Sequence, residues 1–243
     1  MKLLLILLAF MTVLNCHASA INNDIPKLNV VTEDWPPYNY LDKNGEIVGI
    51  ATKRVKSILR AADIHYEITL QPWARAYYTA AKEKNTLIYS IIRNEKREPF
   101  FHWFCPLSPI ESFYFFAFAD KPIDIKSLTD LKKYTIAVSR GQFEYNYLKS
   151  IGLREAVNLY VTPNDGISFN QLLNKKVDLM VDTINSIENR LRNLGLPSNL
   201  LIPVFKLEPE AGIQQCFAIS KGTNSEIIKR ITEAFEKSLI EKN

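Results

Sequence analysis

Apolar and polar positions alternate along the first half of the chain in two rhythms, which predict strands and helices in turn. Residues 28–31 and 87–92 are short apolar runs, and residues 66–70 alternate apolar and polar side chains as half-buried strands do. Residues 52–62 repeat apolar side chains at helical spacing, and a second helix follows Pro72. This order predicts a parallel sheet with loops gathered at the carboxyl ends of its strands.

The second half of the chain repeats this rhythm without repeating the sequence. A strong apolar strand is predicted at 112–119, and the chain ends with a strand at 214–219 and an amphipathic helix at 225–240. Between these, the pattern predicts helices near 127–132, 143–151, 167–174 and 184–194, and strands at 135–138, 159–161 and 178–181. The halves are therefore expected to be similar in architecture only.

This order of elements predicts an α/β protein of two lobes with a cleft between them. One lobe takes residues 21–113 and 217–243, and the other takes residues 114–216. The strands at 112–119 and 214–219 are expected to join the lobes as hinges. Open α/β sheets bind ligands at the carboxyl ends of their strands, so the cleft is the expected binding site.

Residues 1–20 have the pattern of a secretory signal: Lys2, an apolar stretch at 3–14, and small residues at 18–20. An alternative uses Cys16 as a lipidation site, although the preceding Asn15 is a poor small residue. The apolar stretch is short for a membrane span, which needs about 20 residues. We therefore expect an exported protein, soluble in the periplasm.

Charge and cysteines limit the possible partners. The net charge of +4 falls to +3 without the signal, which carries one lysine and no acid, and this is too mild to predict nucleic-acid binding. Cys105 and Cys216 could pair in an oxidising compartment, but their spacing does not decide it. The isolated His65 and His102, and the absence of a Cys-x-x-Cys motif, predict no metal site and no cofactor.

Two segments carry candidate binding residues at the ends of predicted strands. In residues 32–38, two prolines hold Trp35 in an extended loop, where its ring would either touch a ligand or cover the core. In residues 90–97, Arg97 is a natural anchor for a carboxylate because its planar guanidinium matches two carboxylate oxygens. Alternatively, Arg97 pairs with Glu95 or Glu98 on the surface.

These segments, together with Gly45, Gly49, residues 71–76 and residues 106–107, resemble the family 3 extracellular solute-binding proteins. The resemblance covers essentially the whole mature chain in element order. It implies two α/β lobes that close on a small polar solute and hand it to a membrane permease. It therefore implies a monomeric binding protein rather than an enzyme, with an inner-membrane ABC permease or a sensor as its partner.

The resemblance also implies roles for particular residues. Trp35 and Trp73 match aromatic walls, Ser90 and Arg97 match the groups that hold a ligand carboxylate, and Asp182 matches the group that binds an α-amino group. The turn at 139–143 would offer backbone N–H groups to an anion. The residues expected at the ligand are Trp35, Trp73, Arg75, Ser90, Arg93, Asn94, Arg97, Arg140, Gln142, Phe143 and Asp182.

The sequence also departs from the family pattern. Asp182 lies four residues past Asp178 rather than five, and such a slip can turn a side chain to the other face of a strand. Arg75 and Arg93 add positive charge, so the solute is not necessarily a standard amino acid. Trp73 could instead be a packing residue, Arg75 a solvated one, and Asp182 a helix N-cap.

An enzyme on the same scaffold is the alternative from a different class. A dehydratase-like reaction would need Glu33, Asp34 or Asp182 as general acid. No Ser-His-Asp order, metal triad or phosphate loop supports catalysis, so we expect no enzyme activity. A secreted sensory module differs from a transport receptor only in its membrane partner.

Overall fold

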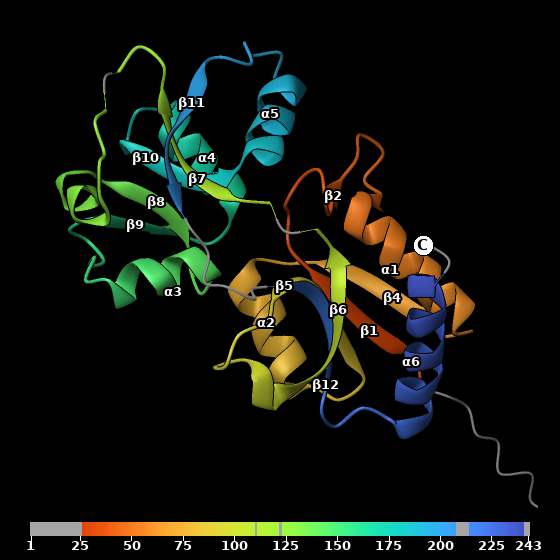
Figure 1. Cartoon of the computed structure of the whole chain (residues 1–243). Coiled ribbons are helices and arrows are strands. Elements are labelled where there is room, and N and C mark those ends of the chain that lie inside the picture. The colour runs from red at the N-terminus through yellow and green to blue at the C-terminus, as the bar shows by residue number, and fades with distance from the viewer. Residues whose placement is uncertain (1–25, 110, 122, 208–213, 241–243) are drawn as a thin grey trace, which may run out of the picture.

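The computed structural model describes residues 26–109, 111–121, 123–207 and 214–240, so the expected signal and the Cys16 alternative lie outside the described part. In these ranges the chain folds into two α/β lobes, each built on its own five-stranded sheet (Figure 1). No helix within them is both long and apolar enough to span a membrane.

The first lobe is built on a mixed sheet with the strand order β4-β1-β5-β12-β6. Its strands are β1 (Leu28–Thr32), β4 (Tyr66–Leu70), β5 (Thr86–Ile92), β6 (Phe101–Ser108) and β12 (Gln215–Ser220). As expected, β1 pairs in parallel with β4 and β5, whereas β12 runs antiparallel to β5 and β6. One face packs against α1 (Ile50–Ala61) and α6 (Ser225–Ile240), and the other against α2 (Trp73–Lys82).

The second lobe has a sheet with the order β11-β7-β10-β8-β9. Its strands are β7 (Phe113–Phe118), β8 (Ile136–Ser139), β9 (Leu159–Thr162), β10 (Leu179–Thr183) and β11 (Leu201–Leu207). Its helices are α3 (Phe143–Ser150), α4 (Asp165–Leu173) and α5 (Ile184–Asn193), and the helix expected near 127–132 is the 3-10 helix η2 (Leu128–Lys133). Apolar residues fill both faces of this sheet.

The chain passes between the sheets twice. It leaves the first sheet at Ser108, the end of β6, and enters the second at Phe113, the start of β7. It returns after Leu207, the end of β11, and rejoins the first sheet at Gln215 in β12. The two strands expected to bridge the lobes therefore each lie inside one sheet, and the crossings fall between strands.

A small hairpin follows the Trp35 loop, as the turn residues at 42–45 indicate. Strand β2 (Tyr40–Leu41) pairs with β3 (Ile47–Val48), and the Asp42 carboxylate accepts hydrogen bonds from the backbone N–H groups of Asn44 and Glu46. Gly49 then starts α1 at a φ of 124°, a value that favours glycine. The hairpin thus connects the loop directly to a helix.

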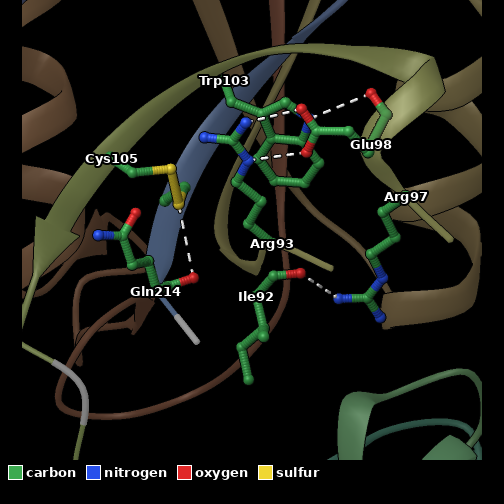
Figure 2. Close-up of a disulfide and its surroundings, with 8 residues drawn as sticks. Ile92, Arg93, Arg97, Glu98, Trp103, Cys105 and Gln214 are labelled. Atoms are coloured by element: carbon green, nitrogen blue, oxygen red, sulfur yellow. Dashed lines mark hydrogen bonds and ion pairs between the residues drawn. A yellow bond between two sulfur atoms is a disulfide. The ribbon is translucent and has the colours of Figure 1, made fainter. Parts of the chain in front are cut away.

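Cys105 and Cys216 form a disulfide, which settles the question that their spacing left open. The bond joins neighbouring strands of the first sheet, β6 and β12, with the Cα atoms 4.6 Å apart (Figure 2). These are the strands next to the two crossings. The covalent loop between the cysteines therefore contains the whole second sheet.

Candidate functional site

A cavity lies between the two lobes, where the carboxyl ends of several strands meet. The first lobe lines it with Glu33, Trp35, Ser90, Ile92 and Arg97, and the second lobe lines it with Phe113, Gln142, Glu144 and Asp165. In the closed lobes the space inside it is small, about 20 Å³. Glu33 follows β1 and Gln142 follows β8, which is the placement expected of ligand-binding residues in α/β sheets.

Trp35 connects the lobes through both its ring and its nitrogen. Its indole Nε1 donates a hydrogen bond of 3.0 Å to the Asp182 carboxylate, and its ring stacks on Phe113 with centroids 6.1 Å apart. Both partners belong to the second lobe. The backbone N–H of Trp35 donates to the carbonyl of Asn39, so a tight turn fixes the residue at the cavity wall.

Arg97 is a buried cation, only 5% exposed, and does not form the surface pair considered from the sequence. Its Nη1 donates to the carbonyl of Ile92 in its own lobe, and its Nη2 to the carbonyl of Gly141 in the other, both at 3.0 Å. The guanidinium lies 5.0 Å from the Trp73 ring centroid, and Trp73 Nε1 also donates to Gly141. Glu98 pairs with Arg93 instead (Figure 2).

Four acids are buried at or beside the cavity: Glu33, Glu144, Asp165 and Asp182. Burial is the main cause that raises the pKa of each of them, because a charged carboxylate loses its water. Burial and the neighbouring Asp165 raise the pKa of Glu144 to about 8. Burial and the neighbouring Asp182 raise the pKa of Asp165 to about 7.

Hydrogen bonds hold three of these acids in place. The Gln142 amide donates to the Glu33 carboxyl across the lobes, and the Ser139 hydroxyl donates to Asp165. Asp182 accepts from the Ser186 hydroxyl and from the backbone N–H of Thr183, each at 2.7 Å, besides Trp35. Thr183, rather than Asp182, is the N-cap of α5.

Two further contacts join the lobes beside the cavity. Arg190 of the second lobe donates through Nη2 to the Asp34 carbonyl at 3.1 Å and lies 3.4 Å from the Asp34 carboxylate. Tyr38 donates its hydroxyl proton to Glu111, which also accepts from Asn185 of the second lobe at 2.5 Å. The structure is therefore that of closed lobes.

The residues predicted from the sequence fall into three groups. Those that line the cavity are Trp35, Ser90, Arg97 and Gln142. Those that contact a lining residue are Trp73, Asn94 and Asp182. Those placed elsewhere are the exposed Arg75, Arg93 and Arg140, and Phe143, which stacks on Tyr147 and packs on the second-lobe core.

Sequence reasoning missed Glu144 and Asp165 as cavity residues and considered Glu33 only as a catalytic acid. Their positions in the sequence could have indicated a binding role, because each residue lies shortly after a strand: Glu33 after β1, Glu144 after β8 and Asp165 after β9. The same rule of strand ends that selected Arg97 would have selected them. A charged residue in the first turn of an amphipathic helix looks solvated in the sequence, which hid Glu144.

The fold is that of the two-lobed periplasmic binding proteins, which confirms the fold implied by the resemblance. No family model and no curated protein matches this chain. Among solved structures, a histidine kinase sensor domain similar to periplasmic binding proteins is 22% identical, with a TM-score of 0.75 over 90% of this chain and 91% of that one.

Two amino-acid-binding proteins of known structure also have a similar fold. An ancestral arginine-binding protein bound to glutamine is 23% identical, with a TM-score of 0.74 over 88% of this chain and 92% of that one. A periplasmic binding protein of Salmonella typhimurium with high arginine specificity is 16% identical, with a TM-score of 0.73 over 87% and 92%.

Proposed function

We propose that this protein is an exported, periplasmic receptor that captures a small polar solute, an amino acid or an analogue, between its lobes. The observation that supports it most is the interlobe cavity, to which both lobes contribute buried charged side chains. The arginine- and glutamine-bound structures of similar fold support the solute class. Residues 1–20 would direct export.

Capture would occur by closure of the two lobes, each built on its own five-stranded sheet. The contacts of Trp35 with Asp182 and of Arg97 with Gly141 would form as the lobes meet. Closure excludes water, and polar contacts strengthen where the local dielectric is low. Arg97 would turn toward a ligand carboxylate, and Asp182 toward an amino group.

The partner would be either an ABC permease or a membrane sensor, since both take up a closed, loaded receptor. A histidine kinase sensor domain of similar fold supports the second choice, and the first is what the family resemblance implies. Both partners require the same ligand-binding step.

A second candidate function is acid–base catalysis, which Glu144 favours because it lines the cavity and because burial there raises its pKa to about 8. A carboxyl that keeps its proton at neutral pH can act as a general acid toward a leaving hydroxyl group. Glu33, whose pKa burial also raises, is the alternative acid.

The test combines native mass spectrometry of the purified protein with calorimetric titration of amino acids, their decarboxylated analogues and organic acids. A co-purified solute, or saturable binding of a panel member without chemical change, is the expected result. Conversion of the bound compound would establish the enzyme. A protein that binds no member of the panel would contradict the proposed receptor function.

A further inference from the structure

We propose that Glu144, with Glu33 and Asp165 beside it, binds a cationic side-chain group of the solute, a guanidinium or an ammonium other than the α-amino group, which enters the cavity in exchange for protons. We call these three residues the acid trio. The inference rests on the proposed function and specifies the solute class and the pH response of the same site. It differs from the expectation that Arg97 and a ligand carboxylate dominate recognition.

Glu144 is a buried acid that lines the cavity, and its carboxyl group has no partner in another of the residues that the structure describes. It is 5% exposed, and among the described residues no side chain donates a hydrogen bond to it or lies within ion-pair distance. Within the described part of the chain, the carboxyl groups of Glu33 and Asp165 accept hydrogen bonds only from the neutral side chains of Gln142 and Ser139. A buried acid of this kind requires either a proton or a cation.

The cations that face the acid trio are engaged elsewhere. Arg97 is the one cation among the residues that line the cavity. Its two terminal nitrogens donate hydrogen bonds to the carbonyls of Ile92 and Gly141, and its guanidinium lies over the Trp73 ring. Arg190, on α5, lies against Asp34 and Asp182. Asp34 and Asp182 themselves add negative charge beside Asp165. The cavity thus has more acids than available cations.

Proton exchange follows from this imbalance. In the closed lobes without a cation, burial and mutual repulsion keep protons on the acid trio, which is why the pKa values of all three are raised. A positive group within about 4–6 Å favours the ionised carboxylate and lowers its pKa again. Binding of a cation therefore releases protons, and the affinity for it rises with pH.

The experiment compares cationic and neutral ligands of similar shape by calorimetry: arginine against citrulline, and lysine against norleucine, with agmatine as a cation lacking a carboxylate. We expect the cationic members to bind about tenfold or more tighter at about pH 8.5, with the ratio shrinking toward about pH 5.5. Titration in buffers with different ionisation enthalpies should show net proton release.

Two isosteric variants test the residues. Glu144→Gln should weaken cation binding about tenfold or more and reduce proton release, while neutral ligands change little. Glu33→Gln, which keeps an acceptor for Gln142, is a second variant if the first does not fold. Glu236→Gln, on the exposed side of α6, is the matched control and should leave both affinities unchanged.

Three outcomes would overturn the inference. Neutral or anionic members that bind as tightly as cations, without proton release, would contradict it and leave the receptor function standing. Equal loss of cationic and neutral ligands in Glu144→Gln would indicate a structural role only. Failure of every panel member to bind would remove the receptor function and this inference with it.

Discussion

Arg97 is held by backbone carbonyls of both lobes rather than by a carboxylate, and this arrangement makes its shape as important as its charge. The planar guanidinium reaches the carbonyls of Ile92 and Gly141 at once and lies over the Trp73 ring. A lysine ammonium carries the same charge without this geometry. We therefore expect that even lysine cannot replace Arg97 without loss of stability.

Replacing Arg97 with lysine should lower the free energy of unfolding by about 2–4 kcal/mol, because two buried carbonyls lose a donor and the ring contact is lost. Urea denaturation of the mature protein measures this change. Arg93→Lys is the matched control, since Arg93 is exposed and pairs with Glu98, and it should stay within about 0.5 kcal/mol of wild type. Equal effects of the two changes would contradict the assigned role.

Residues in one turn also show why side-chain direction escapes sequence reasoning. Arg140 is exposed beside Glu155, whereas Gln142, two residues later, lines the cavity. The sequence places the whole turn at a strand end but not the direction of each side chain. Glu33 and Gln142 meet only because the lobes close, and no local pattern reports a contact between residues so far apart.

At the scale of elements, the first helix holds the Trp35 loop in place. The backbone N–H groups of Ile50 and Ala51, at the start of α1, donate to the carbonyls of Pro37 and Tyr38. Gly49 makes this approach possible, because a Cβ atom there would overlap the Tyr38 carbonyl. The loop that presents Trp35 to the cavity is thus fixed by a helix N-terminus.

Gly49→Ala should therefore destabilise the protein by about 2–4 kcal/mol, since steric overlap with backbone adds to the positive φ. Gly45→Ala is the control: its φ of 81° is also positive, but a Cβ atom there meets nothing within 4 Å. Gly45→Ala should lower the free energy of unfolding by about 1 kcal/mol, because only the positive φ disfavours alanine there. Denaturation curves of both variants give the comparison, and similar losses would show that the contact with Tyr38 does not matter.

Much of the element order was predictable from apolar periodicity, and the exceptions have physical reasons. β4 and α6 were predicted with the bounds that the structure has. β6 and β11 were missed because each contains a proline, Pro106 and Pro203, and both occupy sheet edges, where proline is tolerated.

At the scale of the whole molecule, the buried acids couple lobe closure to pH. In the closed structure Glu144 and Asp165 are buried, and burial raises their pKa values to about 8 and about 7 from ordinary values near 4.5 and 3.8; we expect opening to return water to both. A raised pKa means that protons bind the closed state more tightly than an open, solvated one. The closed state without ligand is thus stabilised at low pH and loses that stability as pH rises through these values.

The radius of gyration of the unliganded protein, measured by small-angle scattering, should therefore increase between about pH 5.5 and about pH 8.5. Glu144→Gln should reduce the increase, because the substituted amide does not ionise. A radius that stays constant, or that decreases with pH, would contradict the coupling.

The disulfide between β6 and β12 also determines how the molecule bears mechanical load. Pulled from its two ends, the chain transmits tension through the first sheet and across the Cys105–Cys216 bond, so the second lobe lies outside the load path. The bond spans 111 positions in sequence, and at about 3.3–3.6 Å of contour length per residue this is a large hidden length. The second lobe would bear force only after the disulfide is reduced. A pulling force applied to the chain ends therefore does not reach the part of the cavity wall that the second lobe contributes.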